Sequence, residues 1–100
     1  MAKLIILYGH PADPRAFEDY YAHQHLPYAA RHMPGVRSAE NIRITAAPDG
    51  AAPPYYRVSQ LTYDSMADLR TGISSEDGRS VIDDLGNFAT GGATILLGED

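Results

Sequence analysis

The order in which strand-like and helix-like patterns follow one another constrains the fold of this chain more than any other feature. Lys3 to Tyr8 is rich in isoleucine and leucine and stops at Gly9-His10-Pro11, which predicts a buried strand followed by a turn. Asp13 then provides a side-chain acceptor for a helix N-cap, and Pro14 suits the first helical position. A helix is therefore expected to begin at about Pro14.

This first helix is expected to be irregular in its middle. Pro27 lies inside the periodic stretch, where it has no amide hydrogen to donate and its ring clashes with the preceding turn. The helix should therefore kink or break near His23 to Leu26. Met33-Pro34-Gly35 is expected to end it.

Three further strands are expected. Val36 to Thr45 and Tyr55 to Tyr63 are enriched in β-branched and aromatic residues, which predicts an antiparallel pair. The stretch between them, Ala46 to Pro54, consists of alanine, proline, aspartate and glycine and is expected to form a long loop. Ala93 to Leu97 is apolar and predicts the last strand.

A second helical region is expected in two pieces. Ser65-x-x-Asp68 has the form of a capping box with aspartate in place of glutamate, and it opens a short helix that should end at Gly72. Ser75-Glu76-Asp77 opens another helical segment, which should end at Gly86.

The resulting order is strand, helix, strand, strand, helix, strand, which is typical of the ferredoxin-like α+β fold. In that fold both helices cover one face of a four-stranded antiparallel sheet. The 100 residues suffice for a single domain, residues 1–100, with one hydrophobic core. The other face of the sheet needs a cover, and a second copy of the chain is the simplest one, so a homodimer is expected.

Composition excludes several kinds of partner. The formal net charge of −5 disfavours nucleic acid, because a phosphate backbone attracts basic surfaces. No apolar run approaches the roughly 20 residues that span a bilayer, so no membrane partner is expected. The chain has no cysteine and shows no small-residue cleavage site near its start, which favours a cytoplasmic protein without disulfides.

The first helix carries one aromatic face with two imidazoles. At about 100° per residue, this face gathers seven side chains: Phe17, Tyr20, Tyr21, Gln24, His25, Tyr28 and His32. His25 lies two residues before a proline that frees a backbone carbonyl, so it is placed to exchange a proton near neutral pH. The alternative is a buried structural histidine that hydrogen-bonds this carbonyl or a tyrosine hydroxyl.

Other polar residues are weaker candidates. Tyr8 and His10 share one side of the first strand and are expected to approach the same pocket from its end. His23 and His25 lie about 200° apart around a helix, so the two rings cannot reach one ion, and no metal site is expected. The same geometry turns His23 outward into solvent.

Short ordered motifs across nearly the whole chain resemble the EthD family. They are Phe17-x-x-Tyr20-Tyr21-x-x-x-His25-x-Pro27, Met33-Pro34-Gly35-Val36, Ser75-Glu76-Asp77-Gly78 and Asn87-Phe88-Ala89-Thr90-Gly91-Gly92. The resemblance implies a dimeric α+β barrel made of two ferredoxin-like subunits packed sheet to sheet. It also implies a relation to cofactor-independent isomerases, dehydratases and monooxygenases, with His25 and one tyrosine of the aromatic pair in functional positions. Tyr28 departs from the leucine that is more usual after the family's proline.

These observations favour an enzyme that needs no cofactor and acts on a hydrophobic carbonyl or aromatic compound, with His25 and Tyr21 as the catalytic residues. We expect the substrate to be bound by five other residues: Tyr8, His10, Phe17, Tyr20 and Tyr28. The pocket is expected between the first helix and the sheet, lined by Tyr8, Phe17, Tyr21, His25 and Tyr28.

A dinucleotide-dependent reductase is disfavoured, because Gly91-Gly92 precedes a strand instead of a helix. Two alternatives stay open. One is a non-catalytic protein that holds a hydrophobic metabolite for an oxygenase system. The other is haem binding through a histidine, which occurs among related dimeric barrels and would be visible as absorbance after haem addition.

Overall fold

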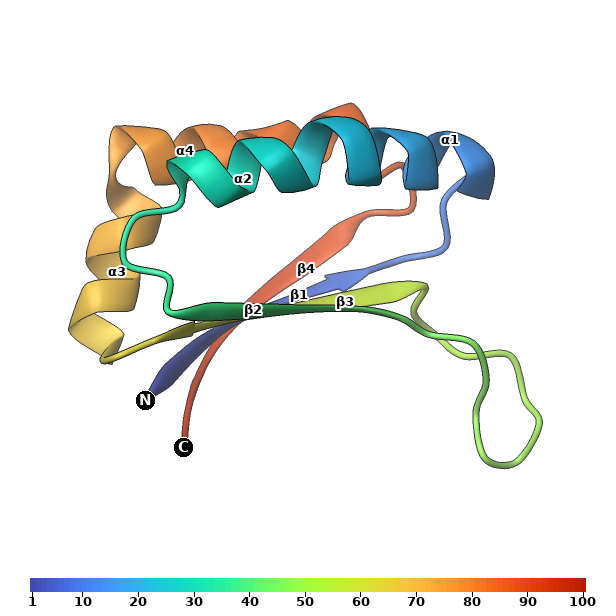
Figure 1. Cartoon of the computed structure of the whole chain (residues 1–100). Helices are drawn as coiled ribbons and strands as arrows, with labels where there is room; N and C mark the ends of the chain where they lie inside the picture. Colours follow the sequence, from blue (N-terminus) through green and yellow to red (C-terminus); the bar gives the residue numbers. More distant parts are fainter.

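The computed structural model describes all residues, Met1–Asp100. Along the chain it contains the strands and helices β1 (Ala2–Tyr8), α1 (Pro14–Tyr20), η1 (Tyr21–His25), α2 (Leu26–His32), β2 (Ser38–Arg43), β3 (Arg57–Tyr63), α3 (Met66–Ser74), α4 (Glu76–Asp83), η2 (Asp84–Asn87) and β4 (Ala93–Glu99). The strands form one antiparallel sheet in the order β2-β3-β1-β4, and the helices lie on one of its faces (Figure 1). The expected ferredoxin-like α+β fold is confirmed.

The core lies between the sheet and the helices. Alternate residues of β1 face the helical layer and are buried: Ala2, Leu4, Ile6 and Tyr8. Ser59 and Tyr63 of β3 are buried on the same face, as the cross-strand pairs with Ile6 and Ala2 require. The helices contribute Phe17, Tyr21, Leu69 and Leu85 to this core. Period-two alternation in β1 therefore separates a buried face from an open one.

The open face of the sheet carries apolar side chains that no helix covers. Ile42, Val58 and Leu7 form one row across three paired strands. Leu96 of β4, opposite Ile5, is 48% exposed. The long loop between β2 and β3 extends away from the sheet on this side (Figure 1). None of the helices has both the length and the apolar character that a membrane-spanning helix requires.

The first helix runs through three consecutive segments and widens where the proline disturbs it. The amide of Leu26 donates to the carbonyl of Tyr21, five residues earlier, which makes η1 a π-helical turn. Pro27 has no amide hydrogen for the carbonyl of His23, so the regular ladder cannot pass this point. The expected departure is confirmed, but it takes the form of a wider turn and the helix does not break.

The second helical region starts as its capping residues predict but does not stop at Gly72. Ser65 Oγ accepts from the amide of Asp68 at 3.0 Å, and Ser75 Oγ accepts from the amide of Gly78 at 3.0 Å. The helix α3 continues past Gly72 to Ser74, so the predicted end was wrong. A Cβ atom at position 72 would lie 2.5 Å from the carbonyl oxygen of Pro34, so this glycine serves close packing and not termination.

We therefore expect Gly72→Ala to lower the free energy of unfolding by about 1–3 kcal/mol, because backbone atoms must move to admit the methyl group. Gly86 is the matched control, since a Cβ atom there meets nothing within 4 Å and its φ is not positive. Gly86→Ala should be neutral or stabilising by up to about 1 kcal/mol. Urea denaturation of both variants measures the difference, and equal stabilities would contradict this packing role.

Candidate functional site

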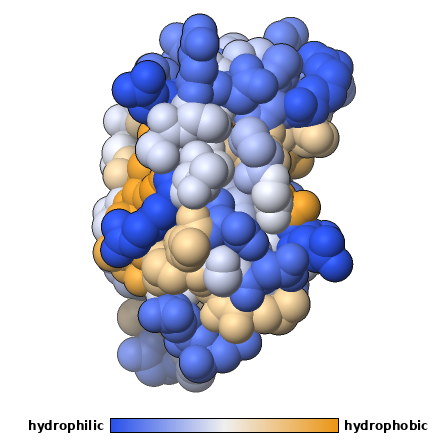
Figure 2. Space-filling model, turned by 90° about the vertical axis from the view of Figure 1, so that its left-hand side faces the viewer, coloured by the Kyte–Doolittle hydropathy of each residue, from blue (hydrophilic) through white to orange (hydrophobic).

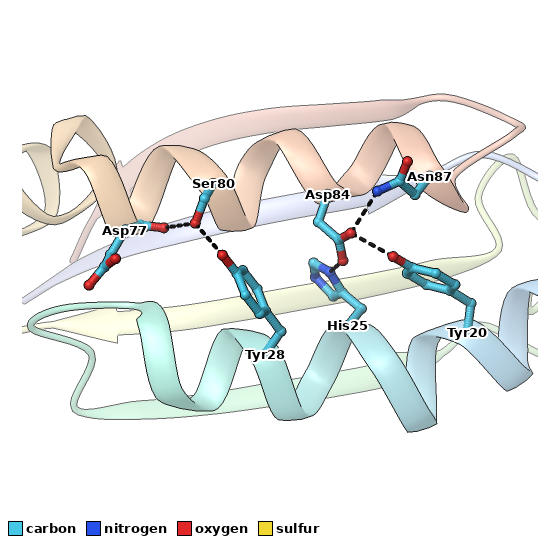
Figure 3. Close-up of polar contacts among 7 residues, drawn as sticks. All are labelled: Tyr20, His25, Tyr28, Asp77, Ser80, Asp84 and Asn87. Carbon is cyan, nitrogen blue, oxygen red and sulfur yellow. Dashed lines mark hydrogen bonds and ion pairs between the residues drawn. The ribbon is translucent and has the colours of Figure 1, made fainter.

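The first helical region (α1, η1 and α2) lies beside the second (α4 and η2) on the sheet. A contact between a buried histidine and a carboxylate links the two regions (Figure 3). His25 closes the π-helical turn η1, and Asp84 opens the short helix η2. His25 Nδ1 lies 2.9 Å from Asp84 Oδ2, and the two side chains are only 5% and 16% exposed. Fifty-nine residues of sequence separate the two, so the fold alone brings them together.

Asp84 is held from three sides. Its Oδ1 accepts hydrogen bonds from the Tyr20 hydroxyl at 2.7 Å and from the Asn87 amide at 2.8 Å (Figure 3). Burial acts to raise the pKa of Asp84, but the hydrogen bonds from Tyr20, Asn87 and His25 outweigh it and lower this pKa. The carboxylate is therefore ionised at neutral pH and orients the ring of His25.

This arrangement defines the role of each ring nitrogen of His25. Because the ionised carboxylate of Asp84 can only accept, Nδ1 carries the hydrogen of the neutral ring. Nε2 then bears the lone pair, and it makes no hydrogen bond within the chain. A histidine held by a carboxylate in this way is oriented to take up a proton at Nε2.

A second polar network lies beneath the same helical turn, on the sheet. The Tyr21 hydroxyl lies 2.8 Å from Ser59 Oγ and 3.0 Å from Asn41 Oδ1, and Ser59 Oγ donates to the same Asn41 oxygen at 2.9 Å. Burial raises the pKa of Tyr21, although the hydrogen bond with Ser59 and the charge of Arg57 oppose this. The Tyr21 hydroxyl therefore remains a protonated hydrogen-bond donor at neutral pH.

Stacked aromatic rings connect the two networks. The rings of Tyr21 and His25 are nearly parallel, with centroids 5.9 Å apart. Phe88 lies 4.7 Å from the His25 ring and 5.8 Å from that of Tyr8. Tyr8 also packs edge-on against Phe17 at 5.4 Å. The hydroxyl of Tyr8 is buried without a hydrogen-bond partner, and burial raises its pKa.

An ion pair lies beside Tyr21. Glu18 of α1 receives two hydrogen bonds from Arg57 of β3, at 2.9 Å from Nε and 2.6 Å from an Nη atom. The guanidinium carbon of Arg57 lies 4.7 Å from the centroid of the Tyr21 ring, within the range of a cation–π contact. The hydrogen bonds from Arg57 hold the pKa of Glu18 below its usual value. This pair anchors α1 to the sheet next to the phenol.

The pocket expected from the sequence is not present as one cavity. Tyr8, Phe17, Tyr21 and His25 are each at most 4% exposed and pack against one another, because aromatic rings at these positions fill the space between helix and sheet. Several cavities lie around this cluster instead, and in three of them neither Tyr8, Tyr21 nor His25 is a lining residue.

The three cavities differ in chemistry. The groove between the helices, about 320 Å³, is polar and is lined by Tyr20, Gln24, Tyr28, Ser80, Asp83, Asp84 and Asn87. A smaller one of about 250 Å³ lies over Phe17 and Phe88. The third, about 380 Å³, is apolar and is lined by Leu26, Ala29, Ala30, Met33, Val36, Ala39, Asn41 and Leu61. We call this third one the α2–β2 cavity.

The remaining candidates have other partners than His25. Tyr28 lines the polar groove, and its hydroxyl is 2.8 Å from Ser80 Oγ. His10 is exposed, and its Nε2 donates a hydrogen bond to the carbonyl oxygen of Pro53 at 2.7 Å. Its ring lies edge-on to the ring of Tyr56. His23 points into solvent, as predicted. No group of three histidine, aspartate or glutamate side chains is placed to hold a metal ion.

Asp84, Asn41 and Ser59 escaped the sequence analysis, because each acquires its role only from a neighbour distant in sequence. One signal was available for Asp84. In a ferredoxin-like fold the two helical regions lie next to each other, so an acidic residue on the second could have been matched to a histidine on the first.

The fold and this site define a small ferredoxin-like α+β protein with an oriented histidine–carboxylate pair. The chain belongs to the EthD family, since residues 9–92 match the family's EthD domain. It is 33% identical over 100 residues to a Rhodococcus erythropolis protein described as an uncharacterized 11.0 kDa protein in the thcB–thcC intergenic region, covering 100% of this chain and 95% of that relative.

Solved structures agree with this assignment. An EthD family protein from Bacillus halodurans is 32% identical and superimposes with a TM-score of 0.90, covering 100% of this chain and 98% of that one. Two less similar structures share the fold. A dimeric ferredoxin-like protein of unknown function from Thermobifida fusca has 14% identity and a TM-score of 0.67, over 99% and 90% of the two chains. SnoaB, a cofactor-independent oxygenase from Streptomyces nogalater, has 15% identity and a TM-score of 0.64, also over 99% and 90%.

Proposed function

We propose that this protein is an enzyme that acts without a cofactor on a hydrophobic carbonyl or aromatic compound, with His25 as general acid and base. The observation that carries the proposal is the buried pair of His25 and Asp84, in which Nδ1 is engaged and Nε2 is free. An imidazole oriented by a carboxylate is a suitable group for proton transfer near neutral pH. Tyr21 stacks on His25 and is the neighbouring hydroxyl, with its single hydrogen directed at Asn41 Oδ1 in the absence of a ligand.

The simplest reaction for these groups is proton transfer next to a carbonyl. His25 Nε2 removes a proton from the α-carbon, the C–H electron pair forms the C=C bond of an enolate, and the carbonyl oxygen takes the charge. The Tyr21 hydroxyl, whose single hydrogen turns from Asn41 Oδ1 to the substrate, donates a hydrogen bond that stabilises that oxygen. His25 then returns the proton to the same or another carbon, which gives exchange or isomerisation and balances without a co-reactant.

Acetophenone in D2O tests this proposal without knowledge of the natural substrate. Its methyl protons are α to a carbonyl, so a general base in the site should accelerate their replacement by deuterium, which proton NMR follows directly. We expect exchange faster than in buffer with an equal concentration of imidazole. A rate that the protein does not change, at concentrations where acetophenone binds, would contradict the catalytic role.

A second function is favoured by one observation. His25 lines none of the three cavities described above, so a ligand held in any of these three would not touch the ring. A protein that only holds a hydrophobic metabolite for an oxygenase system would have this property. Binding of acetophenone without proton exchange is the result that favours this alternative.

We also propose that the working form is a homodimer packed through the open face of the sheet. The row of Ile42, Val58 and Leu7 gives this face an apolar centre. Packing this face against the same face of a second copy would remove these side chains from water. The T. fusca protein of the same fold is dimeric.

Light scattering is expected to give a dimer at micromolar concentration, and Leu7→Glu is expected to give a monomer, because a buried charge without a partner costs several kcal/mol. Ala67→Glu on the exposed side of α3 is the control that adds the same charge elsewhere, and it should leave the dimer intact. A native protein that is monomeric, or a Leu7→Glu variant that stays dimeric, would refute this interface.

A further inference from the structure

The α2–β2 cavity combines an apolar wall with a single polar side chain. Seven of its eight lining residues are hydrophobic, and the eighth is Asn41. Its volume of about 380 Å³ falls within the usual range for small-molecule sites, roughly 300–1,000 Å³. Figure 2, a view of one end of the molecule, shows mainly hydrophilic surface at the top and hydrophobic surface at both edges at mid-height and in the lower centre. A cavity of this composition suits an apolar molecule with one polar group.

The side chain of Asn41 is oriented by its neighbours. Its Oδ1 accepts from the Ser59 hydroxyl and lies within hydrogen-bond distance of the Tyr21 hydroxyl. Its Nδ2 makes no hydrogen bond within the chain, although it carries two hydrogens. Since the oxygen is committed to the buried hydroxyls, the amide nitrogen is the group left to meet a ligand. A fixed donor in an apolar wall selects for a hydrogen-bond acceptor.

We infer that the α2–β2 cavity is the binding site for the apolar part of the ligand, and that Asn41 Nδ2 recognises a carbonyl oxygen on it. The inference rests on the proposed function only in taking the ligand to be a hydrophobic carbonyl compound. It assigns Asn41 as a specificity-determining residue. It also connects this cavity to the candidate catalytic residues, because Tyr21 contacts Asn41 on one side and stacks on His25 on the other.

The test compares two molecules of nearly equal shape, acetophenone and isopropylbenzene, which differ in the carbonyl group. Titration of the 15N-labelled protein is followed through backbone amides around the cavity and through the side-chain amide signals of Asn41. We expect acetophenone to shift the Asn41 side-chain signals and to bind about 3- to 10-fold more tightly than isopropylbenzene, the gain of one neutral hydrogen bond.

Two variants separate recognition from simple hydrophobic binding. Asn41→Asp keeps oxygens that accept from Tyr21 and Ser59 but removes both donor hydrogens, so the preference for acetophenone should disappear. Gln24→Glu makes the same amide-to-acid change in the polar groove between the helices and should keep the preference. Ala29→Leu, which fills the cavity, should weaken the binding of both molecules to a similar extent.

Equal binding of the two molecules by the native protein would overturn the inference, as would a preference that persists in Asn41→Asp. Shifts confined to the polar groove, around Gln24, would also overturn it. The outcome is independent of catalysis. If the native protein fails to exchange the acetophenone protons but keeps the preference, the proposed catalysis fails and this binding site stands.

Discussion

Replacing His25 by alanine is expected to lower the rate of deuterium exchange into acetophenone by about 10²-fold or more, because a positioned acid or base contributes that much to proton transfer. His23→Ala is the matched control. His23 lies two residues away on the same helix but is 72% exposed, paired only with Asp19, so its loss should leave the rate unchanged. The two rates are measured by proton NMR at equal concentrations of folded protein.

The stability of the same variants separates a catalytic from a structural histidine. If His25 serves only to satisfy Asp84, its removal should lower the free energy of unfolding by about 1–3 kcal/mol and leave the rate per folded molecule intact. A catalytic role predicts the loss of rate whatever the change in stability. A His25→Ala protein that melts several degrees lower but still exchanges at the native rate would refute the catalytic role.

Removing the Asp84 carboxylate is expected to give the largest loss of stability at this site. In Asp84→Ala, His25 Nδ1, the Tyr20 hydroxyl and the Asn87 amide all lose their acceptor. Because His25 is buried, we expect the free energy of unfolding to fall by about 2–3 kcal/mol. Asp83→Ala removes the adjacent, exposed carboxylate and should change the free energy of unfolding by less than about 0.5 kcal/mol. Urea denaturation at pH 7 gives both values.

The effect of Asp84 should also depend on pH in a defined direction. Its pKa in the folded protein is lower than the ordinary value of 3.8, so its stabilising contribution is complete well above pH 4. That contribution is lost as the pH falls through the folded-state pKa and the carboxylate becomes protonated in both states. The stability difference between the native protein and Asp84→Asn should therefore shrink on acidification below about pH 4. A difference that grows as the pH falls below about 4 would contradict the lowered pKa of Asp84.

Local sequence patterns predicted most of the fold because the signals for each element are themselves local. The alternating apolar residues of β1 and the capping residues Asp13, Ser65 and Ser75 act within a few positions of where they occur. Pro27 likewise marked the irregular turn of the first helix. Gly72 misled the prediction, because glycine serves both as a helix terminator and as a site of close packing. Only the position of Pro34 across the fold distinguishes the two roles.

Local sequence signals were enough to predict the order of the elements, the aromatic face of the first helix and the presence of His25 on it. The contacts of that histidine depend on the three-dimensional packing of distant segments. Asp84 and Asn41 reach the site from η2 and β2, and hydrogen bonds act over about 3 Å whatever the separation along the chain. The location of the α2–β2 cavity also depends on the tertiary structure. Whether aromatic rings leave a space or fill it depends on how side chains from several elements pack, and periodicity within one helix carries no information about that packing.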